Sequence, residues 1–190
     1  MRYLELAEFY ESLGKTSKRL EKTFLVSELL KRSELSEIDR LILLLQGRVF
    51  PSYDEAKLGV ASKLALKAIS AATGMEMQKV EAEWKKTGDL GKVAENLIGK
   101  KRQATLFANE LSVKKVFDNL RQLPEIEGAK SVDKKLSLIA ELLTSAKPVE
   151  ARYIIRTLLE EMRVGVGDGV IREAIVLAYF GKELGIRASF

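Results

Sequence analysis

The segment EARYIIRTLLEEMRVGVGDGVIREAIVLA, residues 150–178, decides the fold class of this 190-residue chain. Apolar residues recur at helical spacing in its first part, which predicts a long helix from Val149 to Met162 that Pro148 begins. Three glycines and an acid then fall within Gly165 to Gly169, and a second amphipathic pattern runs on to about Phe180. The segment therefore predicts a helix, a glycine-rich turn and a second helix.

Helical spacing continues through the rest of the chain, where no stretch shows the alternation of a strand. Glycine, proline or polar turns separate the periodic stretches, which predict about eleven helices. We therefore expect an all-α fold. A polar region between Gly99 and Asn109 divides a single domain, residues 1–190, into halves of about 1–99 and 110–190.

An internal repeat supports this division into halves. The stretch LGVASKLALKAISAA, residues 58–72, aligns without gaps against VGVGDGVIREAIVLA, residues 164–178, and five of fifteen positions match. The offset of 106 residues predicts that each half contains a copy of one helix–loop–helix unit. The alternative is a chance similarity between two amphipathic helix starts.

Composition excludes several kinds of chemistry. The chain has no cysteine and no histidine, so disulfides, thiol chemistry, Cys/His zinc sites and histidine-based catalysis are ruled out. No stretch approaches the roughly 18 apolar residues of a membrane span, and the start does not resemble a signal peptide. The carboxylates are spaced as on ordinary helix surfaces, so we expect neither a catalytic centre nor a metal site. A net charge of +5 favours an anionic partner only weakly.

The glycine-rich turn is the strongest candidate for binding. It lacks the Gly-Lys-Ser/Thr of a P-loop, and a helix precedes it where a dinucleotide fingerprint needs a strand. The first amides of the following helix are unpaired and can hold a phosphate oxygen. Gly165, Gly167 and Gly169 would let phosphate approach the backbone closely, and Asp168 would cap the helix with its carboxylate. A plain helix–helix turn is the alternative.

Three arginines precede this turn. Arg152, Arg156 and Arg163 lie at i, i+4 and i+11. On a helix with about 100° per residue they fall within roughly 40° of one another. A row of guanidiniums would thus end where the glycine turn begins, and the planar fork of arginine suits phosphate. The alternative is a solvated face on which Glu160 pairs with Arg156.

Cations also accompany other helix starts. Asp89 is expected to cap a helix that follows a double lysine, and the basic turn after Gly99 has no obvious neutralising carboxylate. Several such starts fit a polymer of phosphates, bound through backbone and groove shape independently of sequence, better than one small ligand. Most other basic runs, including Lys15 to Lys22, are interpreted as solvated faces. The further residues expected to contact a phosphate backbone are Gly59, Ser62, Lys63, Lys86, Thr87, Gly88, Lys101 and Arg102.

Several blocks together resemble the N-terminal DNA-binding domain of archaeal and eukaryotic ATP-dependent DNA ligases. They are VFPSYDEAKLGVASKLALKAI, KTGDLGKVAENL and the segment 150–178, in the order of that family, and the likeness covers essentially the whole chain. The resemblance implies two halves related by a pseudo-two-fold axis, and backbone and minor-groove contact around a nicked duplex. It also implies that the RVGVGDG and LGVASK turns contact phosphate, and that adenylation and OB-fold domains lie outside this chain.

The family's adenylation motif, Lys-x-Asp-Gly, does not occur in the chain. Val166 stands where the lysine that takes AMP would precede Asp168 and Gly169. The resemblance therefore implies that this chain binds DNA in replication and repair without ligating it alone. ATP and Mg²⁺ would belong to the absent catalytic domain, and no cofactor is expected here.

The resemblance also sets the expected partners and their rivals. Nicked duplex DNA, the catalytic domains of the same ligase and a sliding clamp are the expected partners, and the expected location is the cytoplasm, at the nucleoid. Rival interpretations are a helical protein-interaction scaffold, a helix-turn-helix regulator and a self-sufficient enzyme. A regulator would prefer one DNA site, a scaffold would not retain DNA at moderate salt, and an enzyme would take AMP from ATP.

Overall fold

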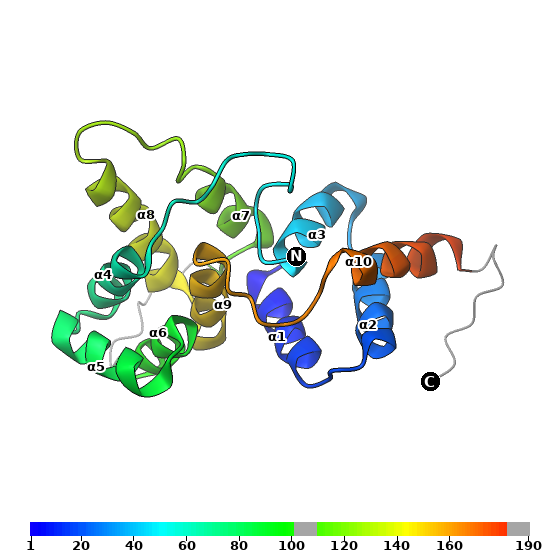
Figure 1. The fold of residues 1–190 in the computed structure, drawn as a ribbon, viewed down its shortest axis with the longest axis horizontal. Helices are drawn as coiled ribbons and strands as arrows, with labels where there is room; N and C mark the ends of the chain where they lie inside the picture. The colour runs from blue at the N-terminus through cyan, green and yellow to red at the C-terminus, as the bar shows by residue number, and fades with distance from the viewer. Residues whose placement is uncertain (101–109, 182–190) are drawn as a thin grey trace.

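The computed structural model describes residues 1–100 and 110–181, and within them it contains ten α-helices and no strand (Figure 1). A short 3-10 helix, η1 (Leu35–Glu37), precedes the third helix, and a π-helical segment, η2 (Val176–Phe180), extends the last. The prediction of an all-α fold is confirmed. The α-helices are α1 (Tyr3–Gly14), α2 (Arg19–Arg32), α3 (Ile38–Leu45), α4 (Ser62–Thr73), α5 (Met77–Thr87), α6 (Leu90–Gly99), α7 (Val113–Arg121), α8 (Ser131–Ser145), α9 (Pro148–Leu158) and α10 (Asp168–Ile175).

Local sequence signals explain several helix boundaries. Asp89 caps α6, because its carboxylate accepts hydrogen bonds from the amides of Gly91 (2.9 Å) and Lys92 (3.2 Å). Pro148 is the first residue of α9. Gly88 ends α5 with a left-handed φ of +65°. The predicted Asp89 cap and the predicted start of α9 are confirmed.

The helix before the glycine-rich turn is shorter than the sequence predicted. It ends at Leu158, and Glu160 adopts a left-handed φ of +55°. Beyond it the chain has no regular secondary structure, because Arg163 and Gly165 adopt left-handed φ of +59° and +66°, and residues 161–167 are alternately exposed and buried. Met162 lies at a position that also fits the helical apolar stripe, which is why the sequence pattern predicts a longer helix. The buried residues of this segment are Met162, Val164 and Val166, and the exposed ones are Arg163, Gly165 and Gly167.

In each half, the helix that follows the repeated glycine turn packs on a helix of the other half. The helix α4 packs on α8, whereas α10 packs on α2. Two contacts nearer the centre are equivalent in the same way: α1 packs on α9, and α7 packs on α3. In Figure 1, α4 and α8 lie at one end and α2 and α10 at the other, with the α3–α4 connection above the centre and the α9–α10 connection below it. A half-turn about the line of sight exchanges the two sets of helices.

Backbone hydrogen bonds join the halves at the centre. The Tyr3 amide donates to the Leu111 carbonyl at 2.7 Å, and the Val113 amide donates to the Met1 carbonyl at 3.1 Å. Tyr3 and Val113 are 110 residues apart, and so are Met1 and Leu111, so the half-turn maps one bond onto the other. The buried apolar residues of both halves form one continuous core. No helix in the described residues is long and apolar enough to cross a membrane.

Candidate nucleic-acid interface

The two repeated glycine turns have the same backbone conformation. Gly59 and Gly165 are both exposed and both left-handed, with φ of +63° and +66°. The residue before each following helix is extended, and the helices begin at Ser62 and Asp168. Both pairs are 106 residues apart, the offset of the sequence repeat. The alignment therefore corresponds to a repeated structural unit that precedes α4 and α10.

A lysine from the other half of the chain approaches each turn. Lys22, on α2, is 9% exposed, and its Nζ donates to the Val164 carbonyl at 2.6 Å. A β-carbon placed on Gly165 would lie 2.7 Å from that Nζ. On the other side of the molecule, a β-carbon on Gly59 would lie 4.0 Å from Nζ of Lys135, on α8. Each turn thus lies beside an ammonium group that a tertiary contact supplies.

Lys22 and Lys135 are equivalent residues of the two halves. LVSELL, residues 25–30 on α2, aligns with LIAELL, residues 138–143 on α8, and the offset of 113 residues also relates the two lysines. Neither ammonium is paired with a carboxylate of the described residues. Lys22 is buried and Lys135 is half-buried, and removing a cation from water is costly unless a counter-ion compensates it. The arrangement therefore suits an anion bound at each turn.

These two lysines were missing from the predicted site. Lys22 belongs to a basic run that local spacing assigns to solvent, and Lys135 belongs to an ordinary amphipathic helix. Each is brought to its turn by contact between the halves, which the local pattern cannot reveal. The LVSELL and LIAELL repeat is the sequence signal that could have paired them.

The predicted exposed row of arginines is wrong. Arg156 is 8% exposed, and its NH2 donates to the Asp89 carboxylate at 2.6 Å. Arg152 binds Glu95, on α6, and Glu11, on α1 (2.6 Å), and its side chain is 17% exposed. This side of α9 faces α6 and α1 and not solvent, so the two guanidiniums meet carboxylates from those helices. The alternative pairing of Arg156 with Glu160 is replaced by the pairing with Asp89.

Arg163 is the member of the three that reaches the surface. It lies beyond the end of α9, with a left-handed φ of +59°, at an exposed position two residues before Gly165. Its side chain is 51% exposed. It donates to Glu161 at 2.9 Å, and its NH1 lies 3.6 Å from the Asp89 carboxylate. A half-exposed guanidinium therefore lies beside the second glycine turn, in contact with two carboxylates.

Asp168 does not cap α10 as predicted. It is the first residue of the helix, one position too far along the chain to be the cap. Its exposed carboxylate accepts hydrogen bonds from Gln46 (2.5 Å) and Arg48 (3.1 Å). Neither α4 nor α10 has a side-chain cap. The first amides of both helices therefore have no side-chain acceptor, as a phosphate-binding helix start requires.

The other residues predicted to contact phosphate lie outside the two glycine turns. At the α5–α6 turn, which contains Thr87 and Gly88, the Asp89 carboxylate already occupies the first amides of α6. The ammonium of Lys86 lies 4.0 Å from the carboxylate of Glu83. This turn thus offers fewer free donors than the glycine turns. Lys101 and Arg102 lie outside the described residues.

Asp89 links the two halves electrostatically. Burial raises the pKa of its carboxyl group, but the hydrogen bond and charge of Arg156, the Lys92 amide and the charge of Arg163 outweigh burial. The pKa of Asp89 therefore lies below its ordinary value. A carboxyl group with a lowered pKa in the folded state stabilises the fold above the unfolded-state pKa, which is about 3.9. This stabilisation is lost as pH falls through the lower folded-state pKa.

We therefore expect acid to destabilise the wild-type chain more than the Asp89→Asn variant. Asparagine keeps a good helix cap but does not titrate. Between about pH 5 and about pH 2, the free energy of unfolding should fall more steeply for the wild type. Urea unfolding followed by circular dichroism at several pH values measures this difference. Parallel curves for the two proteins would show that Asp89 contributes no acid sensitivity.

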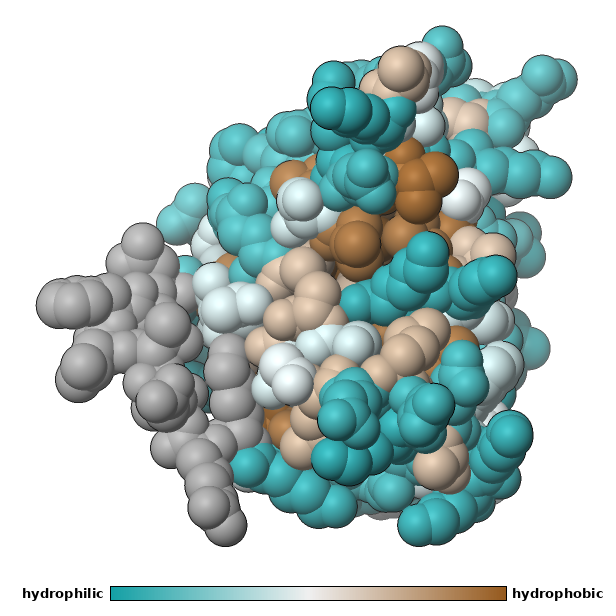
Figure 2. Space-filling model, turned by 90° about the vertical axis from the view of Figure 1, so that its left-hand side faces the viewer, coloured by the Kyte–Doolittle hydropathy of each residue, from teal (hydrophilic) through white to brown (hydrophobic). Residues whose placement is uncertain are grey.

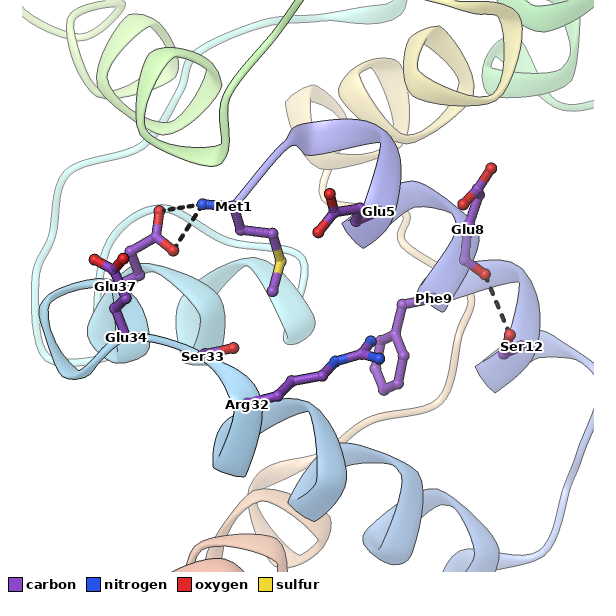
Figure 3. A pocket seen from close by; sticks show the side chains of 9 residues that line it. All are labelled: Met1, Glu5, Glu8, Phe9, Ser12, Arg32, Ser33, Glu34 and Glu37. Atoms are coloured by element: carbon purple, nitrogen blue, oxygen red, sulfur yellow. Dashed lines mark hydrogen bonds and ion pairs between the residues drawn. The ribbon is translucent and has the colours of Figure 1, made fainter.

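A hollow of about 530 Å³ between α1 and the end of α2 is unsuited to phosphate (Figure 3). The Met1 ammonium donates to both carboxylate oxygens of Glu37 at 2.8 Å. Carboxylates outnumber cations in its lining, so its field repels a polyanion. No group of metal-ligating side chains occurs among the described residues. The hollow is lined by Met1, Glu5, Glu8, Phe9, Ser12, Arg32, Ser33, Glu34 and Glu37.

Comparison with known proteins identifies the family. Residues 2–176 match the family model described as DNA ligase N terminus. A DNA ligase of Methanothermobacter thermautotrophicus is 45% identical over 177 residues, which cover 93% of this chain and 32% of that protein. DNA ligases of Nanoarchaeum equitans and Nitrosopumilus maritimus are 42% and 36% identical, over 94% and 96% of this chain and 31% of each relative. The chain thus spans about a third of the length of these relatives. It belongs to the DNA ligase N-terminus family, which confirms the resemblance of its sequence blocks.

Proposed function

We propose that this chain binds duplex DNA at nicks, independently of base sequence, as the DNA-binding domain of an ATP-dependent DNA ligase in replication and repair. The observation that carries the proposal is the pair of equivalent glycine turns, each with a lysine and an uncapped helix start. Two matched anion sites on one rigid core suit a polymer with regularly repeated phosphates. The names of the relatives supply DNA as the substrate class.

Binding would use the phosphate backbone and the minor groove. Exposed Gly59 and Gly165 allow phosphate to approach the backbone amides, while Lys22, Lys135 and Arg163 supply positive charge. Contacts of this kind position a protein on a duplex without reading its bases. The two turns and their cations thus provide affinity without sequence preference.

The chemistry at the nick would belong to other domains of the same ligase. Val166 stands before Asp168 and Gly169 where a Lys-x-Asp-Gly motif would have its lysine, and it is a buried apolar residue that cannot act as a nucleophile. ATP and Mg²⁺ would be bound by the adenylation and OB-fold domains, while this domain holds the duplex for them. This proposal also includes a sliding clamp as a further partner and a location in the cytoplasm, at the nucleoid.

Fluorescence anisotropy with labelled nicked, intact and single-stranded DNA over a salt series tests the proposal. We expect nicked duplex to bind most tightly and affinity to fall steeply with salt. Random-sequence duplex should compete as well as the labelled sequence itself. Resistance to that competitor would favour a sequence-specific regulator, and the absence of DNA binding at moderate salt would favour a protein-interaction scaffold.

The Arg163→Ala variant should bind all duplexes more weakly. Because Arg163 would contact phosphate and not bases, the loss should be equal for unrelated sequences. The salt slope should fall by less than about one, because Glu161 already pairs with Arg163. The same anisotropy titrations measure both quantities. Arg163→Lys is the control, since it keeps a cation at this position. A loss that depends on base sequence, or an unchanged salt slope, would argue against a phosphate contact.

A further inference from the structure

The two glycine turns differ in charge although their backbones are equivalent. At the 106-residue offset, Ser62 of α4 corresponds to Asp168 of α10, and Lys67 of α4 corresponds to Glu173 of α10. The helix α4 contains no acidic residue, and its Lys63 and Lys67 are exposed. The first turn thus leads into a cationic helix, whereas the second leads into a helix that carries two carboxylates.

The carboxylates of α10 bind cations beside the second turn. Asp168 accepts a hydrogen bond from Arg48 at 3.1 Å, and Glu173 accepts one from Arg19 at 2.5 Å. The NH2 of Arg19 would lie 2.9 Å from a β-carbon on Gly169. The carboxylates therefore lie where a phosphate at the second turn would need these guanidiniums.

The lysines around the first turn have no such partners. Among the residues that the structure describes, no carboxylate forms an ion pair with Lys63, Lys67 or Lys135. Asp133, the acid on α8 nearest to Lys135 in sequence, is exposed and forms no ion pair with a described residue. Asp54 accepts a hydrogen bond from the Ala56 amide at 2.9 Å. Figure 2 shows this end of the molecule, with hydrophilic side chains over most of the surface and a smaller apolar area between them. The first turn is therefore open to a polyanion.

We infer that the two turns bind the duplex unequally, the first by direct attraction and the second only when phosphate displaces the carboxylates of α10. An unpaired lysine releases condensed counter-ions from DNA and contributes to the salt slope. A guanidinium that already has a carboxylate partner exchanges one anion for another and gains less. The first turn should therefore supply most of the salt-dependent affinity, and Asp168 should weaken binding at the second. The inference rests on the proposed function.

Neutralising variants on each helix test this inference by anisotropy over a salt series. Lys63→Gln with Lys67→Gln should lower affinity about tenfold and reduce the salt slope by about two. Asp168→Asn should raise affinity about threefold and steepen the slope, since Arg48 becomes available, and adding Glu173→Gln should extend both effects. Lys31→Gln with Lys79→Gln is the control, because it removes the same charge from lysines paired with Glu28 and Glu76.

The results separate the inference from the proposed function. Asp168→Asn alters an exposed side chain, so it should unfold at the wild-type temperature and report on binding alone. The inference is overturned if the α4 variant and the control lose affinity equally, or if Asp168→Asn binds DNA no more tightly than the wild type. The proposed function fails instead if the wild type itself shows no salt-dependent binding to duplex DNA.

Discussion

Asp89→Ala is expected to lower the free energy of unfolding by about 3–5 kcal/mol, the usual cost of leaving a buried charge unpaired. Asp89 is 5% exposed and contacts two elements at once. Its carboxylate caps α6 through the amides of Gly91 and Lys92, and it binds Arg156, itself 8% exposed, at 2.6 Å. Alanine removes the cap and leaves a guanidinium without its counter-ion between α6 and α9. Urea unfolding followed by circular dichroism measures the loss.

A matched control separates this effect from the loss of any ion pair. Asp118→Ala removes an aspartate that pairs with Lys114 on the surface of α7, and it should cost only about 0.5 kcal/mol. A second variant, Asp89→Asn with Arg156→Met, removes both charges, keeps a cap and should recover much of the stability. Similar losses of unfolding free energy for Asp89→Ala and Asp118→Ala would mean that the buried pair of Asp89 and Arg156 stabilises the fold no more than a surface ion pair does.

The packing around Gly91 explains why Asp89 is expected to contribute so much to stability. A β-carbon on Gly91 would lie 2.8 Å from the Arg152 carbonyl oxygen and 2.8 Å from Cγ of Arg156. Glycine thus lets α6 approach α9 so closely that the cap and the ion pair share one carboxylate. Because α6 ends at Gly99 and α9 begins at Pro148, this contact holds distant parts of the chain together.

Local patterns were sufficient for the fold class, the Asp89 cap and the repeated turns. Helical periodicity, a capping aspartate and a glycine before an amphipathic stretch each act within a few residues. The 106-residue repeat extended this local evidence, since two similar stretches predicted two similar backbones. The structure confirms that Gly59 and Gly165 adopt the same left-handed conformation.

Partnerships across the halves could not be predicted from local patterns. Whether a charged face meets solvent or another helix depends on tertiary packing, so Arg152 and Arg156 were assigned to the surface although α9 turns them towards α6 and α1. The opposite error affected Lys22, which spacing assigned to solvent although it is buried beside Val164. The end of α9 was misplaced because the irregular segment after it keeps apolar residues at positions that also fit a helix.

Replacing Lys22 and Lys135 together by methionine should lower the affinity for duplex DNA about 100-fold. A hydrogen bond from an ammonium to a charged acceptor contributes about 1.5–3 kcal/mol, which corresponds to roughly tenfold or more for each lysine. The two residues lie at separate turns, so their effects should add. The salt slope should also fall, mostly through Lys135, because phosphate at the second turn displaces the carboxylates of α10. Methionine is unbranched and apolar, so it fills the space of the buried Lys22 stem. Anisotropy titrations at several salt concentrations measure both quantities.

A control with the same change in net charge decides whether affinity for DNA depends on the lysines at the turns or only on the total charge of the protein. Lys31→Met with Lys114→Met removes two exposed lysines that pair with Glu28 and Asp118 on the helix surface. Those ammonium groups already have anionic partners, so we expect affinity to fall less than about threefold. Equal losses in the two double variants would assign binding to the overall positive charge. A large loss confined to Lys22 and Lys135 would instead require that phosphate meets the protein at the glycine turns, where the two halves contribute one lysine each.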